Sequence, residues 1–129
     1  MRILLDTNVF LWSIAGELSK LSARAARVLR DENNELVLSA ASLWEIALRI
    51  RTGRIHLPEH SEFFHDHMAA LGIRAVLAIE ARHVLGVLQL PGLHRDPFDR
   101  LLVSQCRCEG LSLVSPDRIL RDYPLEVIW

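Results

Sequence analysis

Short apolar segments alternate with longer segments of helical periodicity along the chain, and this alternation most limits the folds open to it. Helical periodicity places apolar residues at i, i+3, i+4 and i+7, as in Leu43, Ile46, Ala47 and Ile50. The short apolar segments predict strands over Arg2–Leu5, Glu35–Leu38, Ile73–Leu77, Leu111–Val114 and Leu125–Ile128. Strands that alternate with amphipathic helices predict an α/β fold, in which about four or five short parallel strands form a central sheet with helices on both faces.

The helix boundaries follow from capping residues, glycine and proline. Ser22 is a candidate N-cap, Gly53 ends one periodic segment, and Pro91-Gly92 ends another. We expect helices over Val9–Ala15, from Ser22 to before Asn33, over Ser39–Thr52, from Pro58 to Leu71, over Ala81–Leu88, from Pro97 onward, and over Pro116–Leu120.

The 129 residues fit one domain, predicted to cover residues 1–129. Half of the residues are hydrophobic, which is enough for a packed core and excludes general disorder. No apolar run approaches the roughly 20 residues that span a bilayer. Asp6 interrupts the apolar start that a signal peptide would need. We therefore expect a cytoplasmic protein.

The charge balance argues against a protein that coats nucleic acid through a broad basic surface. Fifteen basic residues face 16 acidic ones, for a net charge of −1. A small, local nucleic-acid site stays compatible with this balance. Cys106 and Cys108 lie two apart in a predicted helix, where they face different sides and form neither a disulfide nor a zinc site.

Four carboxylates occupy suggestive positions. Asp6 directly follows the first predicted strand, and Asp117 lies three residues beyond the strand Leu111–Val114. If these strands are neighbours, both carboxylates meet at one edge of the sheet, where ligands bind in such folds. Asp99, at a helix start, and Glu45, within a helix, can reach the same place. Clustered carboxylates suit Mg²⁺ or Mn²⁺, and without a metal they would repel one another.

Structural roles explain the same residues, and spacing alone leaves both interpretations open. Asp6 can cap the helix that follows it, and Ser115-Pro116-Asp117 has the sequence of a helix start. Asp99 and Asp117 also suit helix N-termini through the macrodipole. Glu45 and Arg49 are four apart and can form a surface ion pair worth about 0.3–0.5 kcal/mol.

Four segments carry a family resemblance: LLDTN (4–8), SAASLWEIA (39–47), HRDPFDRLL (94–102) and LVSPD (113–117). Together they resemble the PIN domain and, more narrowly, the VapC-like toxins of bacterial toxin–antitoxin pairs. The resemblance covers essentially the whole chain, and its more specific parts are Trp44-Glu45 and the block from Asp96 to Arg100. It implies a parallel sheet with helices on both sides, and RNA cleavage that depends on one or two Mg²⁺ or Mn²⁺ ions.

The resemblance also implies site residues and partners. The catalytic and metal-binding acids would be Asp6, Glu45, Asp99 and Asp117. Asp96 is a possible additional acid, and the supporting residues would be Thr7, Asn8 and Ser115. Four nearby arginines are candidate contacts to RNA phosphates, namely Arg49, Arg54, Arg95 and Arg100. A small antitoxin protein, an RNA substrate and a second copy of the chain would be the partners.

The histidines are expected at the surface or its boundary; they are His56, His60, His65, His67, His83 and His94. Among them, His94 adjoins the acidic block and is a candidate substrate contact.

Two alternatives belong to other functional classes. A receiver-like signalling domain would also place acids at strand ends, but it needs a lysine after a late strand, and Lys20 is the chain's only lysine. An inactive PIN-like module would act through protein–protein contacts alone, although the intact set of acids argues against it.

Overall fold

β1 (Arg2–Leu5) lies at the centre of a five-stranded parallel sheet in the computed structural model, which describes residues 1–129. The strand order is β3-β2-β1-β4-β5, and every neighbouring pair is parallel. The other strands are β2 (Glu35–Ser39), β3 (Val76–Leu77), β4 (Ser112–Val114) and β5 (Val127–Ile128). The predicted α/β class and parallel sheet are confirmed.

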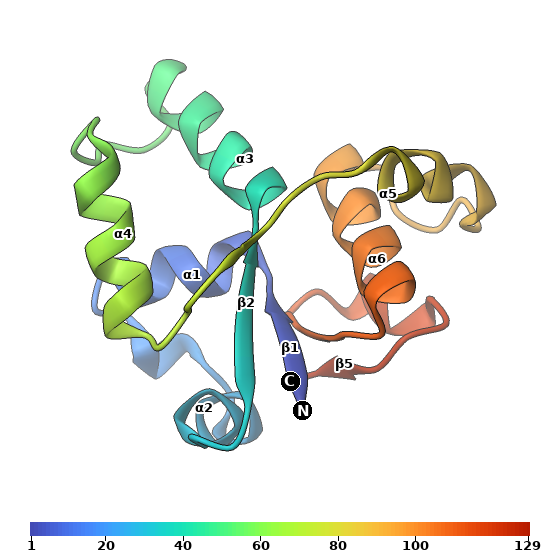
Figure 1. The fold of residues 1–129 in the computed structure, drawn as a ribbon, viewed down its shortest axis with the longest axis horizontal. Coiled ribbons are helices and arrows are strands. Elements are labelled where there is room, and N and C mark those ends of the chain that lie inside the picture. Colours follow the sequence, from blue (N-terminus) through green and yellow to red (C-terminus); the bar gives the residue numbers. More distant parts are fainter.

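Helices cover both faces of this sheet, as Figure 1 shows with α1 and α4 on one side and α5 and α6 on the other. The α-helices are α1 (Thr7–Ile14), α2 (Ala23–Arg30), α3 (Ala40–Arg51), α4 (Ser61–Ala70), α5 (Ala81–Gly86) and α6 (Pro97–Glu109). Short 3₁₀ turns are η1 (Leu18–Lys20), η2 (Val87–Gln89) and η3 (Arg118–Asp122). None of the helices has the length and apolar character needed to cross a lipid bilayer.

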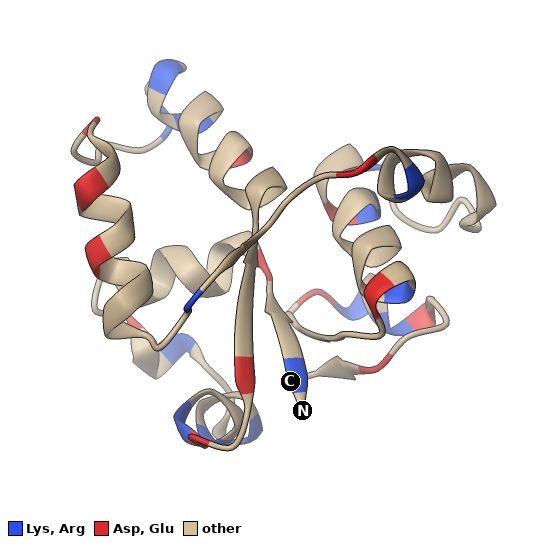
Figure 2. Ribbon diagram, viewed as in Figure 1, with Lys and Arg blue, Asp and Glu red and all other residues tan.

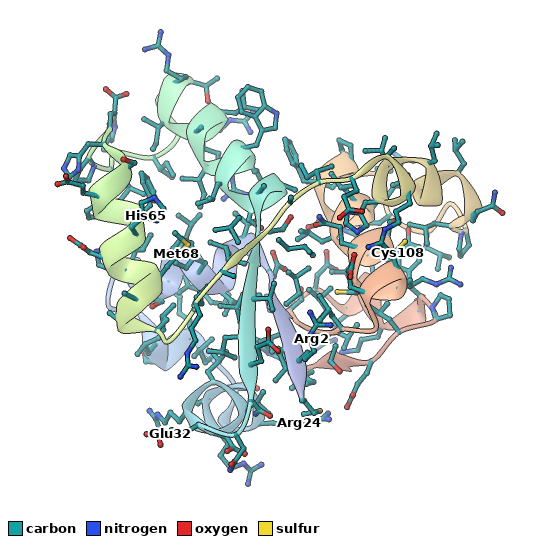
Figure 3. The ribbon with its side chains drawn as sticks, in the orientation of Figure 1. Arg2, Arg24, Glu32, His65, Met68 and Cys108 are labelled. Atoms are coloured by element: carbon teal, nitrogen blue, oxygen red, sulfur yellow. The ribbon has the colours of Figure 1, made fainter.

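Two hydrophobic clusters, one on each face, explain why β1 is apolar at successive positions. Ile3 and Leu5 belong to a cluster that includes residues of α1 and α4, whereas Leu4 belongs to a cluster that includes residues of α6. Alternate side chains of a strand point to opposite faces, so a strand buried on both sides needs apolar residues throughout. In Figure 3, Met68 lies on the side of α4 that faces the strands.

The predicted edge strands were too long. Of the segment Ile73–Leu77, only Val76 and Leu77 pair with β2. Ile73 instead closes the end of α4, where its N–H donates to the Met68 carbonyl at 2.9 Å. At the other edge, the Leu125 N–H donates to the Tyr123 carbonyl, so a turn precedes β5. In each predicted edge strand, only part of the apolar segment forms the strand, and the rest lies in the turn before it.

Three predicted helices also differ from the structure. The helix predicted from Pro58 begins at Ser61, because His60 Nδ1 accepts the Phe63 N–H and caps it there. The segment Ala81–Leu88 divides into α5 and η2. The segment Pro116–Leu120 gives only the 3₁₀ turn η3, with Asp117 as its N-cap.

The expectation of surface or boundary positions was wrong for His83, whose side chain is fully buried. His83 Nε2 lies 2.8 Å from Glu109 Oε1, and its Nδ1 accepts the Glu80 N–H at 3.0 Å. These partners satisfy the imidazole where α5 meets α6, so its burial leaves no polar atom without a hydrogen bond.

Candidate active site

A polar cavity of about 200 Å³ opens at the carboxyl ends of β1 and β4. It has no hydrophobic residue in its lining, which consists of Asp6, Asn8, Glu45, Arg49, Asp96, Asp99, Pro116 and Asp117. All four acids predicted from the sequence lie here, together with the additional acid Asp96. Figure 2 shows acidic segments in red on α3 and at the start of α6. Carboxylates far apart in the chain thus share one cavity.

The pairing of β1 with β4 brings Asp6 and Asp117 together. The Asp6 N–H continues the ladder by donating to the Val114 carbonyl at 3.0 Å. Ser115 then links the two acids, because its Oγ donates to Asp6 Oδ2 at 2.5 Å and accepts the Asp117 N–H at 3.1 Å. Ser115 is thus hydrogen-bonded to both residues, and its supporting role in a reaction stays a prediction.

Glu45 reaches the cavity from α3, which Ser39 caps by accepting the Ala41 N–H. Only 8% of Glu45 is exposed, and its Oε2 lies 2.5 Å from Arg49 Nη2. Arg49 Nη1 also donates to Asn8 Oδ1 at 3.1 Å, which ties α3 to α1. The ion pair considered as a structural alternative is present, and it lies inside the cavity rather than on a solvated face.

Asp96 and Asp99 enter the cavity with different partners. Asp96 is the N-cap of α6, and its Oδ1 accepts the N–H groups of Phe98 at 2.8 Å and Asp99 at 3.3 Å. Burial raises the pKa of Asp99 to about 7, the nearby charges of Asp6 and Asp96 add to this rise, and His94 opposes it. Asp96 thus has a clear capping role, whereas Asp99 offers a carboxylate that burial and its acidic neighbours disfavour in the charged form.

Asp6 shows the same signature of a crowded acidic site. Burial raises its pKa above the ordinary range, while the hydrogen bonds from Ser115 and from the Asn8 N–H oppose the rise. Glu45 and Asp117 add repulsion. Arg49 is the only cationic side chain among the lining residues. Hard oxygen donors with unbalanced negative charge match what Mg²⁺ or Mn²⁺ binds, so these residues fit a divalent cation.

His94 contacts the acids more closely than the sequence indicated. Its Nε2 lies 2.6 Å from Asp117 Oδ2 and 3.2 Å from Asp99 Oδ2. The sequence placed His94 next to the acidic block and made it a candidate substrate contact, but spacing gave no sign of a link to Asp117.

Other predicted residues lie outside this lining. Thr7 Oγ1 donates to Ser42 Oγ at 3.0 Å, a buried link between α1 and α3 that sequence reasoning missed. Arg54 and Arg95 are not among the lining residues. Arg100 is engaged elsewhere, because it donates to the carbonyls of Pro91 and Val87 and to the Tyr123 hydroxyl.

The PIN domain family matches residues 3–125, nearly the whole chain. The chain belongs to the PIN domain family. This PIN domain is 33% identical to "Ribonuclease VapC22" of Mycobacterium tuberculosis over 125 residues, which cover 94% of this chain and 91% of that protein. The expected family resemblance is confirmed, and it rests on sequence as well as on fold.

Solved structures with the same fold include two complexes bound to DNA. VapBC2 from Rickettsia felis, bound to a fragment of its promoter, matches with a TM-score of 0.67 and 18% identity, over 98% of this chain and 97% of that one. VapBC from Salmonella typhimurium, bound to DNA, matches with a TM-score of 0.69 and 17% identity, over 98% and 96%. At this identity, the likeness concerns the fold of the PIN domain.

Proposed function

We propose that this PIN domain is a metal-dependent endoribonuclease and the toxin of a toxin–antitoxin pair. The observation that carries the proposal is the predominantly polar cavity in which Asp6, Glu45, Asp99 and Asp117 converge. The similarity of the chain to a ribonuclease over almost its full length supports RNA as the substrate and phosphodiester hydrolysis as the reaction.

The four acids would hold one or two Mg²⁺ or Mn²⁺ ions. Asp6 is the most buried of them and accepts the Ser115 hydroxyl, so its orientation is fixed before any ion binds. A bound divalent ion supplies a water of lowered pKa and positive charge for the phosphate in the transition state. That positive charge would also oppose the burial and the acidic neighbours that together raise the pKa of Asp99.

The chain's own groups would orient the substrate. Arg49 is the cation of the cavity lining, and its second nitrogen is held by Asn8. A guanidinium in this position suits a phosphate oxygen, since planar N–H pairs bind phosphate well. The pKa of Asp99 is raised to about 7, so about half of the metal-free molecules hold a proton there at neutral pH, and a bound cation would favour the charged form.

The proposal includes partners and location. Relatives of this fold are VapBC complexes, which supports a small antitoxin as the partner of this chain. Val84, Leu85 and Leu88 expose apolar surface on α5 and η2, which supports a homodimer. An RNA-cleaving toxin with an antitoxin partner would act in the cytoplasm, where its substrate lies.

The test is RNA cleavage and growth arrest by the wild-type protein and by Asp6→Asn. Wild type should cleave RNA with Mn²⁺ or Mg²⁺, chelation of the metal should stop the cleavage, and expression of the protein without its antitoxin should arrest growth. Asp6→Asn should lose at least about 100-fold in cleavage, because loss of an outer-shell partner alone costs about 10–100-fold. Asp66→Asn, at an exposed position on α4, is the matched control and should cleave normally.

Two outcomes would count against this function. Full cleavage by a folded Asp6→Asn protein would refute the assignment of the acids. A folded wild-type protein that cleaves no RNA with either metal would favour the inactive PIN-like module. The receiver-like alternative has no support in the structure, because Lys20 pairs with Glu17 and does not line the cavity.

A further inference from the structure

The contacts of His94 fit two roles: the side chain could be a metal ligand, or it could be a hydrogen-bond donor to the acids. Its Nε2 and one carboxylate oxygen from each of Asp99 and Asp117 lie within 4.8 Å of one another. Three such groups could hold a metal ion together. Alternatively, a proton on Nε2 could hold the two carboxylates. The hydrogen bonds around the imidazole ring decide between these two roles.

The other ring nitrogen fixes the position of the proton. His94 Nδ1 accepts the backbone N–H of Asp96 at 2.9 Å. A nitrogen that accepts a hydrogen bond carries a lone pair and no proton, and a neutral imidazole has only one N–H. The proton is therefore on Nε2, where it points to Asp117 Oδ2 at 2.6 Å. A protonated Nε2 has no lone pair for a metal ion.

The backbone around His94 holds the ring in this orientation. The His94 N–H donates to the Tyr123 hydroxyl at 2.8 Å, and only 2% of Tyr123 is exposed. The same hydroxyl accepts a bond from Arg100 at 3.2 Å, and Arg100 also donates to the Pro91 carbonyl at 2.9 Å. Arg100 thus braces the loop that carries His94.

We infer that His94 is a positioning residue that donates from Nε2 to Asp117, with the Asp99 carboxylate 3.2 Å from the same nitrogen, and that it is not a metal ligand. It joins Asp117, the N-cap of η3, to Asp99 on α6, two elements that no strand pairing aligns. Each carboxylate oxygen keeps a further lone pair for a cation. This inference rests on the proposed nuclease for its purpose, but the tautomer itself is a property of the metal-free protein.

An all-oxygen ligand set has a measurable consequence. A nitrogen ligand favours Mn²⁺ over Mg²⁺, because imidazole suits transition metals and Mg²⁺ prefers oxygen. If His94 only positions the acids, its replacement lowers the affinity for Mn²⁺ and for Mg²⁺ by the same factor. If His94 is a ligand, its replacement lowers the affinity for Mn²⁺ more than the affinity for Mg²⁺.

The first experiment reads the tautomer by ¹⁵N NMR of the imidazoles in the metal-free protein. His83 is the internal reference, since its Nδ1 also accepts a backbone N–H, from Glu80 at 3.0 Å. Both rings should show a protonated Nε2 and an unprotonated Nδ1. A proton on Nδ1 of His94 alone would overturn the inference.

The second experiment compares two amide replacements by calorimetric titration with Mn²⁺ and with Mg²⁺. His94→Gln places an N–H donor near the position of Nε2, whereas His94→Asn keeps an acceptor near Nδ1 and loses the donor. We expect His94→Asn to bind both ions about 10–100-fold more weakly and His94→Gln to recover most of the affinity. Equal losses in the two variants, with a larger loss for Mn²⁺, would overturn the inference.

Pulsed EPR of Mn²⁺ in the wild-type protein gives a readout that does not depend on the variants folding. The spectrum should contain no coupling to a directly bound imidazole nitrogen, and such a coupling would overturn the inference. If the wild-type protein binds neither ion, the proposed nuclease fails. The ¹⁵N measurement on the metal-free protein then still decides the role of the His94 proton.

Discussion

His83 and His94 have the same local hydrogen bonding in two regions with different charge. Each Nδ1 accepts a backbone N–H, and each Nε2 faces a carboxylate, Glu109 at 2.8 Å for His83 and Asp117 at 2.6 Å for His94. At the α5–α6 contact, Arg82 also pairs with Glu109. In the cavity, further acids surround Asp117. The same pattern of hydrogen bonds therefore stabilises packing around His83, where the charges balance, and orients acids around His94, where negative charge is in excess.

The pKa shifts in the two regions have opposite signs for this reason. The hydrogen bond from His83 and the charge of Arg82 hold the pKa of Glu109 below its ordinary value. Burial and neighbouring acids raise the pKa of Asp99 to about 7 and also raise that of Asp6. Ionised Glu109 stabilises the fold, whereas ionised Asp99 opposes it. Local conflicts of this kind are expected at functional sites.

The largest expected effect is that of Asp99→Asn, which should lower activity and raise stability. Asp99→Asn should lower RNA cleavage by at least about 100-fold, since it removes one of the carboxylates proposed to bind the metal. Because burial raises the pKa of Asp99 to about 7, Asp99→Asn should also raise the free energy of unfolding of the metal-free protein at pH 8, by about 1–2 kcal/mol after allowance for partial exposure. Urea unfolding and a cleavage assay measure the two effects.

Glu109→Gln is the matched control. It removes a favourable charge from the α5–α6 contact, so it should lower the free energy of unfolding and leave RNA cleavage unchanged. An Asp99→Asn protein that is less stable than wild type would show that the charge of Asp99 supports the fold, and the contrast between the two regions would be lost.

The second prediction concerns His83 as a packing residue. His83→Ala should lower the free energy of unfolding by about 2–4 kcal/mol, because it leaves a cavity and removes the partners of Glu109 and of the Glu80 N–H. The contact is close, since a Cβ on Gly86 would lie 2.4 Å from Ser104 Oγ. Mn²⁺ affinity of the folded fraction should not change. A weaker affinity would mean that the α5–α6 contact also shapes the acidic cavity.

Local signals in the sequence mark where each acid lies, but their convergence depends on which strands are neighbours. Asp6 follows a strand that is apolar throughout, and such strands lie in the interior of a parallel sheet. The pairing of Leu5 with Val114 then fixes Asp6 near Asp117. Glu45 belongs to a helix whose start at Ala40 and end at Arg51 agree with its capping signals.

The remaining features depend on partners distant in sequence. Arg100 follows Asp99 directly, but its side chain contacts the Pro91 carbonyl and the Tyr123 hydroxyl instead of the cavity. His94 acquires its role from Tyr123 and Asp117, which lie in another part of the chain. His83 can be buried because Glu109, on another helix, accepts a hydrogen bond from its Nε2. No periodicity or spacing in one sequence contains this information.

The smallest expected effect is a difference in pH dependence between the two regions of the metal-free protein. Folding raises the pKa of Asp99 from about 4 to about 7, so the unfolded chain loses this proton first as pH rises. The folded state then binds more protons than the unfolded state, so stability falls with rising pH across that range, by about 1–2 kcal/mol in total after allowance for partial exposure. Glu109 has the opposite sign, because folding lowers its pKa. Its contribution is complete above pH 4.5 and is lost as pH falls through the folded value.

Urea unfolding of the metal-free protein between pH 4 and pH 8 tests this difference. Asp99→Asn should flatten the decline between about pH 5 and pH 7, while Glu109→Gln should leave that decline in place and weaken the loss of stability at the acidic end. A decline that persists unchanged in Asp99→Asn would assign the proton to another acid of the cavity, with Asp6 next in line because its pKa is also raised. Because the slope reports a proton bound by the folded protein alone, this measurement identifies which carboxylate of the metal-free cavity holds the proton that a bound cation would have to displace.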